Sequence, residues 1–245
     1  MTDLRYLEDK EKFIAYAYDV LGRHFGSMDE FVSEFESIST DEAKNEFLRL
    51  VSFYKYLVKD GRFYVNERGE QKYVDYLDET HRYVALMSLI EALYSKEEFV
   101  DFYEWLRRSD RNSYLPIEDP GQLDELYKHY KSHHGAIQKA VRFFTDLDPA
   151  LHWKLKRGVT QYKRKEISNG SQDVEELEAT IEGIAKTLYQ IRSDFVHYGK
   201  LVLELGGTLT LSRRGNRYLI TGLSLDDLGD LFEIGILDFF RVRHR

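Results

Sequence analysis

The sequence predicts a mainly α-helical protein with a small β-rich segment near its C-terminus. Only three of the 245 residues are proline. Along most of the chain apolar residues recur every three or four positions, which is the pattern of amphipathic helices. After Gly199 the pattern changes to short runs of β-forming residues separated by glycines. A chain of this length can bury a sizeable hydrophobic core.

The composition restricts the possible classes of function. Charged residues make up 32% of the chain and the formal net charge is −8. The molecule as a whole therefore repels phosphate, and any contact with nucleic acid must come from a local basic patch. The absence of cysteine excludes disulfides and cysteine-based metal or redox chemistry. Because the first residues are charged and no apolar run approaches a membrane span, we expect a cytoplasmic protein without a membrane partner.

The first half of the chain predicts helices with one interruption. Residues 8–60 show two or three amphipathic helical patterns, and "STDEA" at 39–43 is a typical helix start. "KDGRFYVNERGEQ" at 59–71 contains two glycines and predicts a loop or a short strand pair. Residues 78–95 are apolar nearly all round, which indicates a buried central helix, and 96–108 continue the helical pattern.

The next part predicts two long helices joined by an irregular segment. A breaker at 109–121 precedes a helix from Leu123 to Leu147, and an irregular basic connection is expected at 148–170. From Ser171 the apolar spacing predicts a second long helix. Its stripe consists of Val174, Leu177, Ile181, Ile184, Leu188, Ile191 and Phe195.

The C-terminal part predicts three short strands and a helix. "LVLEL" (201–205), "TLTLS" (208–212) and "RYLITG" (217–222) are separated by "GG" and "RRGN", which is typical of a three-stranded meander. Ser224 and the acidic residues after it predict the start of a terminal helix.

The patterns together divide the sequence into three regions. Residues 1–76 are an N-terminal helical region and residues 77–200 a helical bundle. Residues 201–245 hold the meander and the terminal helix.

The end of the second long helix, "YQIRSDFVHYGK", carries the residues with the clearest chemical potential. Arg192 is a permanent cation whose planar fork suits a phosphate. His197 titrates near neutrality and can take and give a proton. Together they suit metal-free transesterification of a phosphodiester. The histidine would move the proton of a 2′-hydroxyl or of the leaving oxygen, and the arginine would stabilise charge on phosphorus.

Helix geometry constrains this pair. Five residues of ideal helix rotate by about 140° and rise by about 7.5 Å, so Arg192 and His197 do not share one face. Convergence on one phosphate requires the helix to loosen near Gly199, or a second copy across a two-fold axis. Asp194 is placed to accept a hydrogen bond from His197 and fix its tautomer. The alternative is that cations and histidines merely end the helix, because its carbonyl end is partly negative.

The stretch from Arg192 to His197 resembles the Arg-x4–6-His signature of HEPN domains, and "IRSDFVHYGK" is similar to the Apea-like branch of that superfamily. "SLIEALY" resembles the wording around the acidic residue that these domains often carry in an earlier helix, which here is Glu91. A carboxylate buried in so apolar a helix needs a cation partner, and Arg192 is the partner that the resemblance suggests. The alternative is that Glu91 reaches solvent at the helix edge.

The resemblance covers about residues 78–200 and implies an up-and-down helical bundle, usually dimeric. Many HEPN domains are metal-independent endoribonucleases of defence, toxin–antitoxin and RNA-processing systems. The implied catalytic residues are Arg192 and His197, with Glu91, Ser193 and Asp194 in support. The implied partners are RNA, a second copy of the chain and a nucleotidyltransferase antitoxin.

The sequence departs from the HEPN pattern at two positions, and two alternative functions remain beside the endoribonuclease. Ser193 stands where the family often has asparagine, and Tyr198 follows His197 directly, so the His-x-Tyr extension of some toxins does not apply. The alternatives are a non-catalytic module that binds a nucleotide or a partner and a structural dimerisation protein.

A basic segment before the signature helix is a candidate RNA-binding surface. Cations interleaved with aromatic rings suit single-stranded RNA through phosphate contacts and base stacking. The candidates are Trp153, Lys154, Lys156, Arg157, Tyr162, Lys163, Arg164 and Lys165. The alternative, equally weighted, is a solvated loop whose charge offsets acidic neighbours.

Three residues at helical spacing give a weaker indication, that of a metal site. Glu125, His129 and His133 are spaced by four residues, which can place ligands on one helix face. No second cluster completes a site, so we interpret these as surface residues and predict no metal or other cofactor.

Overall fold

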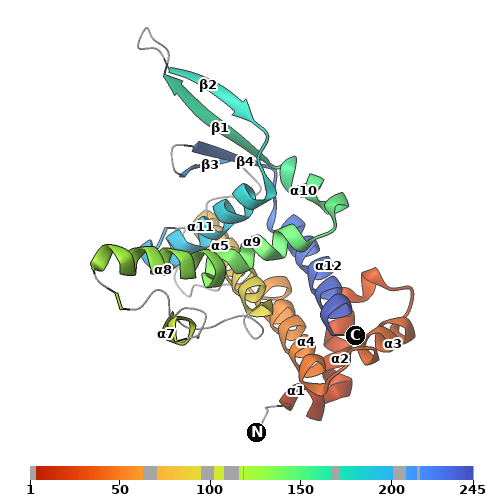
Figure 1. Cartoon of the computed structure of the whole chain (residues 1–245). Coiled ribbons are helices and arrows are strands. Elements are labelled where there is room, and N and C mark those ends of the chain that lie inside the picture. The colour runs from red at the N-terminus through yellow and green to blue at the C-terminus, as the bar shows by residue number, and fades with distance from the viewer. Residues whose placement is uncertain are drawn as a thin grey trace.

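The computed structural model describes most of the chain as a helical body with a four-stranded sheet at one end (Figure 1). The mainly helical fold is therefore as predicted. The described residues are 4–62, 71–94, 102–107, 116–117, 119–166, 172–200, 208–213 and 216–244.

The N-terminal region folds into the helices that its apolar spacing predicts. Helices α2 and α3 bury residues at helical spacing, whereas α4 is buried nearly all round. Thr40 accepts a hydrogen bond from the backbone nitrogen of Ala43 at 3.2 Å, which confirms the helix start predicted at 39–43. Most of the loop predicted at 59–71 lies outside the described residues. The elements are α1 (Arg5–Glu8), α2 (Lys10–Leu21), the 3-10 turn η1 (Gly22–His24), α3 (Met28–Glu36), α4 (Asp41–Tyr54) and the π-helical turn η2 (Lys55–Lys59).

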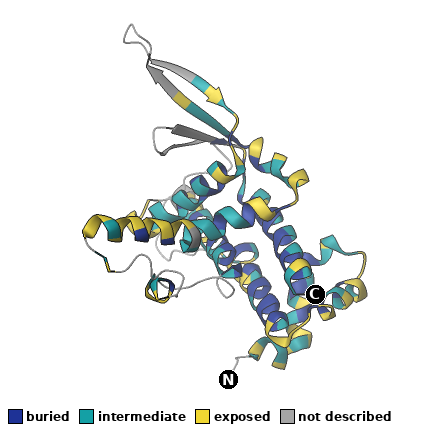
Figure 2. Ribbon diagram, viewed as in Figure 1, coloured by how far each residue is buried: buried dark blue, intermediate teal, exposed yellow. Residues whose placement is uncertain are grey.

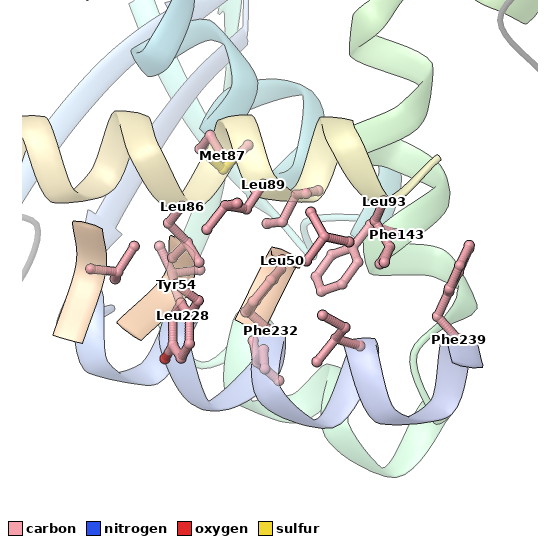
Figure 3. Packing of buried hydrophobic residues seen from close by; sticks show 14 of the residues in the cluster. Leu50, Tyr54, Leu86, Met87, Leu89, Leu93, Phe143, Leu228, Phe232 and Phe239 are labelled. Atoms are coloured by element: carbon pink, nitrogen blue, oxygen red, sulfur yellow. The ribbon is translucent and has the colours of Figure 1, made fainter. Parts of the chain in front are cut away.

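Two long helices form the centre of the core. They are α5 (Gln71–Leu93), which confirms the predicted central helix, and α12 (Leu225–Arg243), which confirms the terminal one. Figure 3 shows Leu86 and Leu89 of α5 and Leu228 and Phe232 of α12 pointing into the space between the two helices, beside Tyr54 of α4. Ser224 caps α12 through a reciprocal pair of hydrogen bonds with Asp227.

The main core joins all three regions of the sequence. Its buried residues run from Ile14 to Phe240, and Figure 2 shows them concentrated along α4, α5 and α12. The regions divided at 76 and 200 therefore pack as one unit. Within the described ranges, no helix combines the length and the apolarity needed to cross a bilayer.

The single helix predicted from Leu123 to Leu147 is wrong. The chain instead forms α8 (Pro120–His134) and α9 (Ala136–Asp146), separated by Gly135, whose ψ of 146° is extended. A Cβ at Gly135 would lie 2.6 Å from the carbonyl oxygen of Lys131, so this break requires glycine. The break lets the two halves serve different cores, because α9 packs on the main core and α8 packs on α7.

A second, smaller hydrophobic cluster lies between α7 (Phe102–Leu106) and α8. Trp105, Leu126 and Tyr130 are its buried members. The helix predicted at 96–108 is confirmed over α7, whereas residues 95–101 and most of the breaker at 109–121 lie outside the described residues.

The irregular connection predicted at 148–170 is also wrong, and so is the first part of the helix predicted from Ser171. The chain forms η4 (Pro149–Leu151), α10 (His152–Lys156), β1 (Val159–Glu166) and β2 (Gln172–Leu177). Helix α11 (Ile181–Tyr198) begins only after Thr180, whose side chain accepts from the backbone nitrogen of Gly183. The spacing of Val174 and Leu177 fits a helix equally well, but this segment pairs antiparallel with β1, with Arg164 opposite Val174.

The sheet has the order β2-β1-β4-β3 and is antiparallel throughout. Strands β3 (Thr208–Arg213) and β4 (Asn216–Thr221) confirm two strands of the predicted meander. The third predicted strand, 201–205, lies outside the described residues, and β1 pairs with the free side of β4. Val159 and Ile220 are opposite each other and buried, which joins the sheet to the core, while the β1–β2 hairpin projects from the body (Figure 1).

A buried carboxylate fixes the N-terminal helices to α12. Glu233 is 0% exposed and four side chains from the N-terminal region converge on it. Arg23 Nε donates to it at 2.7 Å and Tyr54 Oη at 2.9 Å, while His24 Nε2 and Lys59 Nζ each lie at 3.0 Å. The contacts come from η1, α4 and η2, so this one side chain connects three elements to the central helix.

Candidate functional site

The candidate site lies at the C-terminal end of α11. The helix buries Ile184, Leu188 and Ile191 against the core, as its spacing predicts. It remains helical through Tyr198 and ends at Gly199, which has φ 65° and donates its backbone N–H to Phe195 at 2.8 Å. The helix therefore does not loosen before His197.

Gly199 gives the first testable prediction. Replacing it by alanine is expected to lower the free energy of unfolding by about 1 kcal/mol, because a side chain disfavours this left-handed conformation. A Cβ there meets no atom within 4 Å, so backbone strain alone causes the loss. Asparagine tolerates this conformation and should lose clearly less. Urea unfolding of both variants measures the difference, and equal losses would contradict this role of Gly199.

Arg192 and Glu91 form the ion pair that the sequence predicts. Arg192 Nε lies 3.3 Å from Glu91 Oε1, and the two side chains are 19% and 16% exposed. Glu91 therefore has the cation partner that the resemblance suggests, and a small part of its side chain stays exposed. Both of these atoms are buried and neither is aligned for a hydrogen bond, so the contact is electrostatic.

Lys139 and Tyr189, which the sequence did not predict as site residues, interact with the Glu91–Arg192 pair. Burial raises the pKa of Glu91, and the charges of Arg192 and Lys139 oppose that rise. Burial also lowers the pKa of Lys139, with Glu91 opposing. The guanidinium of Arg192 lies 5.7 Å from the ring centre of Tyr189. Lys139 directly precedes buried Ala140 on α9, and this position beside an apolar stripe is the signal that could have revealed it.

His197 is exposed and lies apart from this pair. Its ring contacts Tyr198, with 6.3 Å between centroids. The expected contact from Asp194 to His197 is not made within the described residues. Asp194 accepts from Gln190 Nε2 at 3.2 Å and lies 3.7 Å from Lys200 Nζ instead. Ser193 is partly buried on the same helix.

A single chain therefore does not bring the candidate catalytic residues together. Arg192 is directed at Glu91 of α5, whereas His197 faces solvent from the last turn of α11. Because α11 stays regular, its rotation keeps the two side chains on different faces. Because the helix end is not loosened, convergence of Arg192 and His197 on one phosphate would require a second copy of the chain.

The candidate RNA-binding residues lie on two elements rather than on one loop. Trp153, Lys154 and Lys156 are on α10, and Arg157 follows it with its guanidinium 4.6 Å from the ring centre of Trp153. Tyr162, Lys163, Arg164 and Lys165 are on β1. The side chains of Arg164 and Lys165 lie outside the described residues.

The cations on and after α10 already have acidic neighbours. Lys154 Nζ lies 3.8 Å from Asp230, Arg157 lies 3.4 Å from Asp227, and Lys156 pairs with Glu178. On β1, Lys163 is opposite Glu175 in the register. This supports the alternative in which the basic segment offsets nearby acidic charge, and it weakens the case for an RNA-binding surface there.

The candidate metal residues do not form a cluster that the structure supports. Glu125 and His129 line a shallow hollow on α8 with Gln122 and Leu126. The side chain of His133 lies outside the described residues. In the described part of the chain, no three histidine or acidic side chains are grouped so that they could hold a metal ion.

Comparison with protein-family models, with curated proteins and with solved structures gives no match for this chain.

Proposed function

We propose that this protein is a metal-independent endoribonuclease of HEPN type that acts as a homodimer. The observation that carries the proposal is the half-buried pair of Glu91 and Arg192, which joins the two segments that resemble HEPN domains. A carboxylate withdrawn from water fixes the position of the guanidinium, and a fixed cation is what transition-state charge stabilisation needs.

The reaction follows from the two side chains. The 2′-oxygen of a ribose attacks the adjacent phosphorus, the bond to the 5′-oxygen breaks, and a 2′,3′-cyclic phosphate and a 5′-hydroxyl result. His197 takes the proton of the 2′-hydroxyl or gives one to the 5′-oxygen. Arg192 stabilises the negative charge that develops on the phosphoryl oxygens.

The dimer is needed because the helix separates the two residues within one chain. Val196 and Tyr198 flank His197 and are exposed, Tyr198 to 74%. Exposed apolar side chains beside a site suit contact with another protein surface. A two-fold arrangement that packs these residues would bring His197 of one copy towards Arg192 of the other.

A second candidate is a non-catalytic module that binds a nucleotide or a partner, such as a nucleotidyltransferase antitoxin. The ion pairs of the cations on and after α10 favour it, because they leave little charge to attract a long RNA. Such a module would use the same end of α11 for recognition without cleaving RNA.

Cleavage of a mixed-sequence RNA in the presence of a chelator tests the proposal. Arg192→Ala and His197→Ala are each expected to slow cleavage by at least about 100-fold relative to wild type. Lys186→Ala on the same helix and His129→Ala on α8 are matched controls that should retain the wild-type rate. Equal cleavage by wild type and both site variants would contradict the proposal, and so would an inactive wild type.

A further inference from the structure

A cavity of about 130 Å³ lies where the N-terminal end of α4 meets the C-terminal ends of α5 and α12. Leu93 of α5 and Phe239 of α12 line it, and Figure 3 shows both near the same end of the core. The cavity is independent of the endoribonuclease proposed above, because neither Arg192 nor His197 belongs to its described lining. It offers a separate place for a ligand.

The walls of the cavity are apolar and suit a small ring. Ala43, Leu93, Phe239 and Phe240 are buried, and Ala92 adds to the same lining. The two alanines leave space that a larger side chain would fill. An apolar cavity of about 150 Å³ stays free of water and binds benzene. A cavity of nearly that size therefore fits one six-membered ring, which can pack edge to face on the two phenylalanines.

One carboxylate at the opening selects the charge of the ligand. Thr40 and Glu42 are exposed, so the cavity reaches solvent beside the start of α4. Glu42 has no ion-pair partner among the described residues. Glu46, the other carboxylate of the lining, accepts from Arg49 Nε at 2.8 Å, so its charge is already matched. A cation beside Glu42 would supply the charge that this opening lacks.

An anion is not favoured here, although the opening lies at a helix N-terminus. Asp41 and Glu42 in the first turn of α4 already offset the partial positive charge of that end. Thr40 accepts a hydrogen bond from the backbone nitrogen of Ala43, so one of the donors of that end is satisfied. The described lining contains no lysine or arginine, and the ring of His244 packs on Phe240 with 5.2 Å between centroids.

We propose that this cavity binds a small aromatic amine. The ring lies between Ala43, Leu93 and Phe239, and the ammonium group lies beside Glu42. Apolar walls supply most of the contact area and one polar group at the opening fixes the orientation, which is the usual construction of a small-molecule site. Nothing in this site depends on cleavage of RNA.

Thermal unfolding with benzylamine tests the site. Ionic strength is held constant, and each protein is compared with itself without ligand. With a dissociation constant on the order of 1 mM, about 10 mM benzylamine should raise the Tm of wild type by about 3 °C, because it binds the folded state. Benzyl alcohol has the same ring without the charge and should bind about 5-fold more weakly. Phenylacetate, an anion, should bind more weakly still.

Variants of the lining locate the ligand. Ala43→Leu fills part of the cavity and should abolish the Tm shift with benzylamine and with benzyl alcohol. Glu42→Gln keeps the cavity and should reduce the affinity for benzylamine to that for benzyl alcohol. Ala15→Leu, at an exposed position of α2, is the matched control and should bind as wild type does. Ala92→Leu fills the same space from α5 and replaces Ala43→Leu if that variant does not fold.

Four results would overturn the amine site. They are a wild type that benzylamine does not stabilise, equal binding by the filled variant and Ala15→Leu, phenylacetate that binds at least as tightly as benzylamine, and an affinity for benzylamine that Glu42→Gln leaves unchanged. The last of these would mean that the carboxylate takes no part in selecting the ligand.

Discussion

Replacing Glu233 by glutamine is expected to lower the free energy of unfolding by about 3 kcal/mol, because removing one partner of a buried ion pair leaves the others uncompensated. Glutamine keeps the shape of the side chain and can still accept from Tyr54, so the loss isolates the charge. The expected loss of unfolding free energy is at the low end for the removal of a buried ion-pair partner, because Arg23 and Lys59 are partly exposed and can turn towards water.

Urea unfolding measures this loss, and Glu36→Gln is the matched control. Glu36 also binds two cations, Lys10 and Lys44, but its side chain is 41% exposed. An exposed ion pair contributes at most about 1 kcal/mol, so the control should lose much less. Equal losses at Glu233 and Glu36 would mean that the buried carboxylate does not connect the N-terminal helices to α12 as described.

Acid should remove the difference between wild type and Glu233→Gln. Burial raises the pKa of Glu233, but hydrogen bonds from His24, Lys59 and Arg23 and the charge of Lys59 together hold it below the ordinary glutamate value. A lowered folded-state pKa means that the stabilisation is present above the unfolded-state pKa and is lost as pH falls through the folded-state pKa. Unfolding free energies measured from neutral to acidic pH should therefore converge for the two proteins.

The sequence predicted the helices of this fold better than its strands, and the reason is physical. A helix is specified by its own spacing, so α5, α12 and the second half of the predicted signature helix are found where the stripe lies. A strand depends on a partner elsewhere in the chain. Val174 and Leu177 fit a helical stripe, and only the pairing of β2 with β1 decides against it. The helix break at Gly135 also depends on distant parts of the chain, because α8 and α9 pack against two separate hydrophobic clusters.

At the candidate site, the sequence predicts the ion pair between Glu91 and Arg192, because leaving a buried carboxylate unpaired costs much free energy. A carboxylate in an apolar helix requires a cation, and this requirement together with the resemblance predicts the pairing of Glu91 with Arg192. Lys139 lies on α9, and the local sequence does not predict that α9 packs beside α5. The expected contact between Asp194 and His197 is not made because His197 is exposed and Gln190 and Lys200 contact the Asp194 carboxylate instead.

The largest expected effect on activity concerns hybrid dimers. A copy carrying Arg192→Ala and a copy carrying His197→Ala, each with its own tag, can be co-expressed and purified through both tags. If each site combines Arg192 of one copy with His197 of the other, this hybrid has one intact site of two. It should cleave RNA at about half the wild-type rate, although each parent homodimer is nearly inactive.

The reciprocal hybrid makes the test decisive. Wild type paired with the double variant, Arg192→Ala with His197→Ala, has no intact shared site and should be inactive. If both residues act within one chain, the outcomes reverse, and this second hybrid keeps half the rate while the first has none. The geometry of α11 favours the shared arrangement. The helix is regular through Tyr198, Arg192 is held inward by Glu91, and His197 faces solvent, where a second copy can meet it.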